Sequence, residues 1–306
     1  MSSAIDRMND GSQRPPRLRR DLNLGTLLDL PPGSSGARAS LAEQLALVKD
    51  KGYEAVNHWS QHEAILAAGL RATGMARITE PAQADEVARG HRALGLDATA
   101  VHLGSSLDDD AHAERLIAAL LEASSRHNYP MYLETHRATL TQDIWRTLRW
   151  VAQFPQLRFN ADLSHWYAGH EMTYANEFPA RAARLEPVLA RTRFVHARIA
   201  NAGCVQVPPD AEGPSTAHFR QLWQRCFRGF LDGAGPGDVL SFNPELLPAC
   251  IEAEGLWIHY AQRHPALAES PLSGEPSDRF ADADRLWALG CEAFEAARAD
   301  LDAERT

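Results

Sequence analysis

The chain is poor in cysteine, and its four cysteines are widely spaced. None belongs to a Cys-x-x-Cys pair of the kind that holds structural zinc or a redox disulfide. The sequence also lacks any run close to the ~20 apolar residues of a membrane-spanning helix, and its N-terminus lacks the apolar segment of a signal peptide. We therefore expect a cytoplasmic protein in a reducing compartment, with no membrane partner.

Basic residues are outnumbered, with 31 Lys and Arg against 40 Asp and Glu, and the formal net charge is −9. Nucleic-acid binders usually carry clustered Lys and Arg, and here only the segment RPPRLRR at 14–20 is of that kind. We expect no nucleic-acid partner. Residues 1–18 are interpreted as a flexible tail rather than a nucleic-acid arm, and residues 19–306 as a single folded domain.

The dinucleotide-binding pattern G-x-G-x-x-G and the P-loop are absent, since the glycines of LNLGTLLDLPPGSSG at 22–36 have the wrong spacing. What the chain does contain is an alternation of short apolar segments with helix-like stretches, such as SLAEQLALVKDKG at 40–52, with Ser40 as a plausible N-cap. Eight segments are predicted as strands: 22–28, 52–59, 72–78, 98–104, 130–136, 157–163, 193–199 and 238–245.

This alternation predicts an α/β protein with parallel strands joined by crossover helices. Eight such units in a chain of 306 residues are typical of a single (β/α)8 TIM barrel. Residues 246–278 follow the last predicted strand, are rich in Pro, Ser and Glu, and are expected to form a long irregular loop over the barrel mouth.

Polar residues recur near the carboxyl ends of the predicted strands, which is where barrel enzymes build their active sites. Side chains alternate between the faces of a strand, so residues two apart point the same way. The pairs that share a face in this manner are Glu134 with His136, Asn160 with Asp162, His196 with Arg198, and Asn243 with Glu245. Charges that point into a barrel are costly unless they are paired or bind a cation.

Each of these residues also has a purely structural explanation. Glu134 and Glu245 could pair with arginines, Asp162 could cap a helix, and His196 could be a hydrogen-bonded core histidine. Three carboxylates and one imidazole at equivalent strand ends nevertheless favour a catalytic metal site. Oxygen and nitrogen ligands suit one divalent ion such as Mn²⁺, Mg²⁺, Co²⁺ or Zn²⁺, and four protein ligands leave positions open for substrate.

The remaining ionisable residues at strand ends are interpreted as substrate contacts. His136, His165 and Arg198 are expected to bind substrate or to support the ligands. His58 and His102 end two further strands, and they could bind substrate or only pack.

Five blocks of the chain resemble the xylose isomerase-like TIM-barrel superfamily, which includes sugar isomerases, ketose epimerases, inosose dehydratases and the related apurinic-site endonucleases. The blocks are VHLG (101–104), YLETHRATLTQD (132–143), NADLSHW (160–166), VHARIANAGCVQVPPD (195–210) and NPELLP (243–248). They are most similar to the sugar phosphate isomerases and epimerases of that superfamily.

The resemblance implies a metal held by Glu134, Asp162, His196 and Glu245, with His165 and Arg198 near substrate oxygens. It also implies that Glu134 and Glu245 form an acid/base pair acting on a hydroxy-ketone through an enediolate. The expected function is a sugar or polyol-derived hydroxy-ketone isomerase or epimerase with a small carbohydrate substrate.

Two departures from the resemblance narrow this expectation. The segment IANAGCVQVPPDAEGP at 199–214 lacks the Asp-x-His pair that the endonucleases need for further zinc ions. The late block continues as ELLPACIEAEGLWIHY, which leaves Trp257, His259 or Tyr260 as candidate lid residues.

The alternatives that stay open are a polyol dehydratase on the same scaffold and a non-catalytic sugar- or metal-binding barrel. Few basic residues lie at the predicted mouth apart from Arg137 and Arg198, which favours an unphosphorylated substrate. The sequence is compatible with a homo-oligomer and does not decide the matter.

Overall fold

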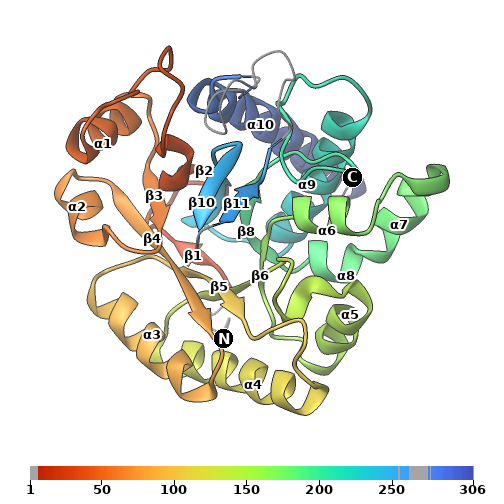
Figure 1. The fold of residues 1–306 in the computed structure, drawn as a ribbon. Coiled ribbons are helices and arrows are strands. Elements are labelled where there is room, and N and C mark those ends of the chain that lie inside the picture. Colours follow the sequence, from red (N-terminus) through yellow and green to blue (C-terminus); the bar gives the residue numbers. More distant parts are fainter. Residues whose placement is uncertain (1–5, 254–255, 262–274, 276, 306) are drawn as a thin grey trace.

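Eight parallel strands close into a barrel in the computed structural model, which describes residues 6–253, 256–261, 275 and 277–305. Each strand pairs with the next, and the last also pairs with the first, which closes the ring (Figure 1). The strands are β2 (Arg17–Asn23), β3 (Ala55–His58), β4 (Arg71–Ile78), β5 (Thr99–Leu103), β6 (Met131–Glu134), β7 (Phe159–Ala161), β8 (Thr192–Ala197) and β9 (Asp238–Pro244). The predicted single (β/α)8 TIM barrel is confirmed.

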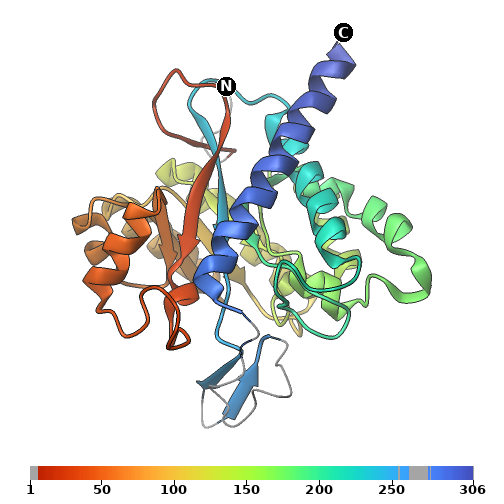
Figure 2. The ribbon, with the colours of Figure 1, turned by 90° about the horizontal axis from the view of Figure 1, so that it is seen from above.

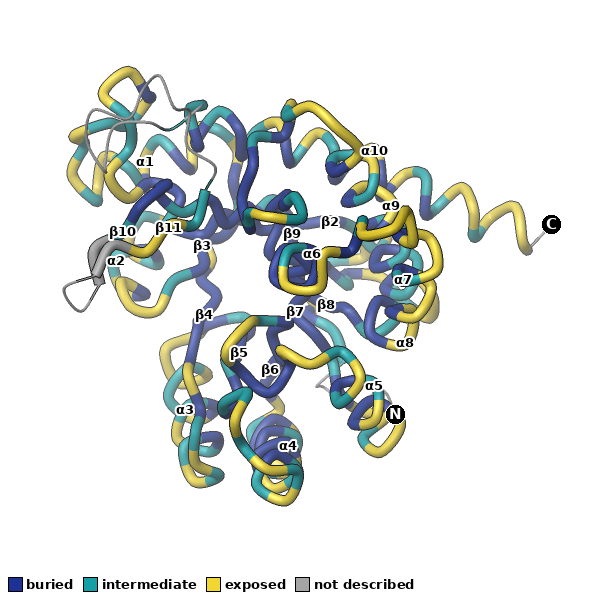
Figure 3. The backbone as a smooth tube through the Cα atoms, turned by 45° about the vertical axis from the view of Figure 1, so that its right-hand side comes forward, coloured by how far each residue is buried: buried dark blue, intermediate teal, exposed yellow. Residues whose placement is uncertain are grey.

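Helices surround the strands, and Figure 3 shows the buried strands at the centre with the exposed segments on the outside. They are α1 (Leu41–Asp50), α2 (His62–Ala67), α3 (Pro81–Ala93), α4 (Asp110–His127), α5 (Ile144–Gln153), α6 (Ser164–Gly169), α7 (Phe178–Arg184), α8 (Glu186–Leu189), α9 (Ser215–Leu231) and α10 (Arg279–Arg305). Short 3-10 helices lie at Leu24–Leu27, Leu140–Gln142 and Tyr174–Asn176. Among the described residues, no helix combines the length and apolarity needed to cross a membrane.

Local sequence explains several of these elements. Ser40 caps α1 as predicted, in a capping box with Glu43 that satisfies backbone donors of the first turn. On the strands, the apolar residues of the outward face pack against helices. Phe242 of β9, for example, meets Trp223 and Phe227 of α9 edge-on, with ring centroids 5.2 and 5.9 Å apart. Polar residues on the opposite face, such as Asn243 of the same strand, are left facing the barrel interior.

The N-terminal segment differs from the prediction of a flexible tail over 1–18. Met8–Asn9 forms β1, which pairs antiparallel with β9, and Met8 is only 4% exposed. Its side chain belongs to a buried apolar cluster at the amino end of the barrel, together with Ala98, Tyr132, Phe194 and Val239. Burial of that methionine and the ladder with β9 hold the segment in place.

The basic cluster at 14–20 is likewise part of the fold. The first barrel strand begins at Arg17 rather than at the predicted residue 22, and its arginines are paired. Arg17 bonds both oxygens of Glu54 at 2.7 Å, and buried Arg19 bonds both oxygens of Asp21 at 2.7 Å. Composition indicated exposed basic residues, whereas the acidic partners that neutralise them are Glu54, just before β3, and Asp21, on the same strand.

The stretch after β9 also differs from the expected irregular loop. Its described part contains an antiparallel hairpin of β10 (Cys250–Ala253) and β11 (Leu256–His259). Figure 2 shows this hairpin projecting from the end of the barrel opposite β1. The Tyr260 ring lies 5.7 Å from the Arg137 guanidinium, which places it over the mouth, and His259 is exposed. The side chain of Trp257 and residues 262–274 and 276 lie outside the described part.

Candidate active site

Four buried side chains converge at the carboxyl end of the barrel. Glu134 ends β6, Asp162 follows β7, His196 lies in β8 and Glu245 follows β9. They are 1%, 0%, 1% and 7% exposed, and one ligand atom from each lies within 4.8 Å of the others. The structure thus brings together the four residues that the sequence motifs suggested as metal ligands.

The two nitrogens of His196 lie in different surroundings. Nε2 is 3.3 Å from Oδ1 of Asn57, an oxygen that can accept its proton. Nδ1 has no hydrogen-bond partner among the described residues, and lies 3.4 Å from Oε2 of Glu134 and 3.3 Å from Oε2 of Glu245. A proton on Nε2 leaves the Nδ1 lone pair directed at the carboxylates, which is the tautomer of a metal-binding histidine.

Electrostatics of this group favour a cation. Burial opposes the charged imidazolium, but the charges of Glu245 and Glu134 outweigh it and raise the pKa of His196 to about 10. The carboxylates thus hold a proton on Nδ1 strongly when no other cation is near, and a divalent ion would take the place of that proton.

Glu134 is held by neighbours on both oxygens. His102 Nε2 lies 3.0 Å from Oε1, and Asn160 donates from Nδ2 to Oε2 at 3.0 Å. Burial acts to raise the pKa of Glu134, but His102 and His196 outweigh it and hold that pKa well below its ordinary value. Asn160 also accepts a hydrogen bond from the backbone N–H of His196, so it orients two of the four residues.

The two carboxylate oxygens of Asp162 have different hydrogen-bond partners. Oδ1 accepts hydrogen bonds from the backbone N–H, at 3.1 Å, and from the hydroxyl of Ser164, the first residue of α6. Oδ2 faces the cluster and accepts a short hydrogen bond from Nη2 of Arg198. Oδ1 therefore bonds the first residue of α6, whose N-cap is Leu163 rather than Asp162, whereas Oδ2 faces inward.

Glu245 is bonded from two sides as well. Asn23 of β2 donates to Oε1 at 3.1 Å, and Arg198 donates to Oε2 at 3.3 Å. Burial acts to raise its pKa, but His196 and Arg198 outweigh it, so the pKa of Glu245 is lowered. Asn23 also donates to Asn57 at 3.1 Å, and sequence reasoning missed both amides although the alternation along β2 and β3 places them inward.

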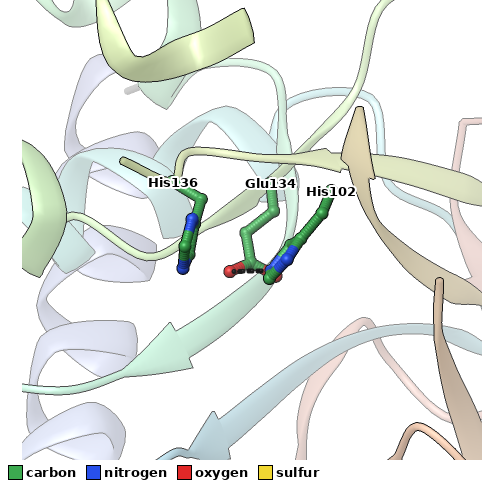
Figure 4. Close-up of side chains that lie close together, drawn as sticks. All are labelled: His102, Glu134 and His136. Carbon is green, nitrogen blue, oxygen red and sulfur yellow. Dashed lines mark hydrogen bonds and ion pairs between the residues drawn. The ribbon is translucent and has the colours of Figure 1, made fainter. Parts of the chain in front are cut away.

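Three histidines form a row beside the cluster. The ring centroids of His102 and His136 are 4.2 Å apart, and those of His136 and His165 are 4.0 Å apart. Figure 4 shows the Glu134 carboxylate between the rings of His102 and His136, and these three residues form a second group whose ligand atoms lie within 4.8 Å. Burial lowers the pKa of His136 and, together with His136 and Arg198, that of His165. This row lies next to the carboxylates, where the predicted substrate contacts were placed.

His58 is not brought into this group. Its Nδ1 lies 2.7 Å from the backbone oxygen of Ser60, because strand alternation turns its neighbour Asn57 inward and His58 outward. The residue that does reach the row is Trp59, whose ring meets His102 edge-on at 5.1 Å. Residues 57 and 59 lie two positions apart and so point to the same side of the strand. An inward Asn57 could therefore have indicated that Trp59, rather than His58, reaches the site.

Comparison with known proteins finds no protein-family model and no curated protein that matches this sequence. Solved structures do match in fold. L-ribulose 3-epimerase is 13% identical with a TM-score of 0.55 and covers 94% of this chain and 98% of its own. A xylose isomerase-like TIM barrel protein from Mycobacterium smegmatis, in complex with magnesium, is 13% identical with a TM-score of 0.55, covering 97% and 100%.

D-allulose 3-epimerase from a Methylomonas species, in complex with D-allulose, is 14% identical with a TM-score of 0.50, covering 95% of this chain and 99% of its own. At these identities the similarity is one of fold. It extends over nearly the whole of each chain, so the matched barrels are of the same extent as this one. The protein therefore shares the TIM-barrel fold of these solved structures.

Proposed function

We propose that the protein is a divalent-metal-dependent isomerase or epimerase of a sugar or polyol-derived hydroxy-ketone. The observation that carries the proposal is the placement of two ionised carboxylates on either side of one imidazole nitrogen. Glu134 on β6 and Glu245 after β9 approach Nδ1 of His196 to 3.4 and 3.3 Å, and that buried nitrogen has no hydrogen-bond partner in the described part of the chain.

The donor set fits a divalent cation. Glu134, Asp162, Glu245 and His196 would hold it, and their ligand atoms are close enough to surround one ion. The supporting amides Asn23, Asn57 and Asn160 already bond these side chains and would fix their orientation. The chemistry supplied by an ion there is Lewis-acid stabilisation of the negative charge that develops on an enediolate.

The protein's own residues would move the proton. One of Glu134 and Glu245 would remove the proton from the carbon between the two substrate oxygens, and the other would return a proton to the opposite face in an epimerase. In an isomerase the proton would return to the neighbouring carbon. The lowered pKa of each carboxyl keeps the abstracting group in the basic form, whereas the group that returns a proton must first take one up from solvent, and the abstracting group releases its proton to solvent afterwards.

The test is exchange of a substrate hydrogen with solvent. Metal-loaded protein would be incubated in D₂O with a panel of ketopentoses and ketohexoses, and the products analysed by NMR and mass spectrometry. We expect deuterium at a carbon next to the carbonyl, and a loss of about 10²–10⁴-fold in the exchange rate for Glu134→Gln and for Glu245→Gln. The exposed Glu122→Gln, on α4, is the matched control and should exchange at the wild-type rate.

The outcomes separate the alternatives. A product lighter by one water would indicate a dehydratase instead. Tight sugar binding without any label uptake would indicate a non-catalytic binding barrel. Full exchange activity in both Gln variants would contradict the assigned acid/base pair.

A further inference from the structure

Arg198 lies inside the carboxylate cluster. It follows His196 by two residues on the same face of the chain and is only 2% exposed. Its Nη2 donates to Oδ2 of Asp162 and, at 3.3 Å, to Oε2 of Glu245, while its Nε donates to the hydroxyl of Ser164 at 3.2 Å. The guanidinium is therefore fixed between two of the four proposed metal ligands.

Arg198 donates to Oδ2 of Asp162 and Oε2 of Glu245, and these are the two oxygens with which Asp162 and Glu245 would bind an ion. Oδ1 of Asp162 is occupied by Ser164, and Oε1 of Glu245 is occupied by Asn23. Only Oδ2 and Oε2 of these residues face the cluster, and both accept from the same nitrogen of Arg198. An arginine is always charged in proteins, so its guanidinium and a divalent ion at these oxygens would repel each other strongly in so buried a site.

A second observation concerns the hydrogen-bonding capacity of the Arg198 side chain that the carboxylates leave unused. Its other terminal nitrogen, Nη1, is buried and has no hydrogen-bond partner among the described residues. A buried guanidinium N–H without an acceptor is costly, which suggests that a further oxygen is its partner when the site is filled. The oxygens of the proposed hydroxy-ketone are of that kind.

We infer that Arg198 is the resident counter-cation of Asp162 and Glu245, which a divalent ion must displace, and that Arg198 thereby sets the ion affinity of the site. Displaced from the carboxylates, the guanidinium would bind substrate oxygens, so ion and substrate would each favour the binding of the other. The part of this inference that concerns substrate rests on the proposed function. The part that concerns the ion does not require any turnover.

The experiment is a titration of metal-free protein with Mn²⁺, without substrate, followed by calorimetry and by the electron paramagnetic resonance of free Mn²⁺. Arg198→Gln should bind Mn²⁺ at least about tenfold more tightly than wild type, because the competing charge is gone. Arg198→Lys, which keeps the charge, should stay closer to wild type. Arg137→Gln removes one exposed charge at the same mouth and should change the Kd by less than about twofold.

Unchanged or weaker Mn²⁺ binding by Arg198→Gln would overturn the inference, as would the absence of Mn²⁺ binding by both proteins. If Arg198→Gln folds poorly without an ion, the inference can still be tested by measuring the Tm of both proteins in chelator and with Mn²⁺. In chelator, Arg198→Gln should melt below wild type, because Asp162 and Glu245 lose their fixed cation, and Mn²⁺ should raise its Tm by more than it raises that of wild type. An equal or smaller rise would count against the inference. If no sugar took up deuterium, the proposed isomerase or epimerase activity would be contradicted, but the Mn²⁺ measurements would still test the role of Arg198. The two proposals can therefore be refuted independently.

Discussion

His196 holds a proton between two carboxylates when no other cation is present, and this links the stability of the metal-free protein to pH. The pKa of His196 is raised from 6.5 to about 10, because Glu245 and Glu134 outweigh the effect of burial. A group with a raised folded-state pKa stabilises the fold fully below its unfolded pKa, and that stabilisation is lost as the pH rises toward the folded value.

We therefore expect the free energy of unfolding of metal-free protein to fall between pH 6.5 and about 10, by about 5 kcal/mol from this group. Urea unfolding in chelator across this range would measure it. In His196→Asn the pH-dependent part should be missing, whereas the exposed His170→Gln should follow wild type. Parallel wild-type and His196→Asn curves would contradict the assignment.

The alternation of side chains along a strand allowed most inward residues to be identified from sequence, but one strand was assigned with the wrong residue facing inward. Glu134, Asp162, His196 and Glu245 meet as the alternation suggested. His58 does not join them, because it stands one position from the inward residue Asn57. The pairing of Arg198 with Asp162 could not be predicted, since it depends on distances between side chains of different strands.

At the scale of elements, β1 closes the amino end of the barrel. Met8 packs with Tyr132 and Phe194 beneath the polar layers, and Asp6 beside it forms ion pairs with Arg158 and Arg193. The segment thus fills interior space and ties strands together in a region that composition alone described as a tail.

Met8→Ala should destabilise the fold by about 2–3 kcal/mol, because it removes a buried thioether side chain and leaves a cavity. Urea unfolding of the metal-loaded protein would measure the change. Leu107→Ala, at a side chain that is 92% exposed, is the control and should stay within about 0.5 kcal/mol of wild type. A cost below about 0.5 kcal/mol for Met8→Ala would support the flexible-tail interpretation instead.

The eight barrel strands followed from periodicity, whereas several strand boundaries, those of the first strand above all, and the three strands outside the barrel did not. The first strand starts at Arg17 because its arginines find acidic partners, and residues Leu24–Leu27 continue as a 3-10 helix after Asn23 accepts a hydrogen bond from Gly25. The hairpin of β10 and β11 was missed because a short antiparallel pair inside a polar segment gives little periodic signal.

For the whole molecule, ion binding should couple to folding, because the four proposed ligands come from four different strand units. Mn²⁺ at about a hundred times its Kd should add about 2.7 kcal/mol to the free energy of unfolding. Scanning calorimetry with and without chelator would measure this, and Asp162→Asn should lose most of the effect. An identical Tm with chelator and with Mn²⁺ would contradict the metal site. The carbohydrate substrate and the possible homo-oligomer stay predictions.

Closure of the barrel through β9 also bears on how the chain acquires its fold during synthesis. β9 pairs with β1 and β2 near the start of the chain as well as with β8. The ladder between Arg17 and Val239, and that between Met8 and Val239, join residues more than two hundred positions apart. Contacts of such sequence separation form slowly, and the early strands lack their partner until β9 has left the ribosome. Until β9 has been synthesised, β2 therefore lacks a partner on the edge that β9 covers, although β3 pairs with its other edge.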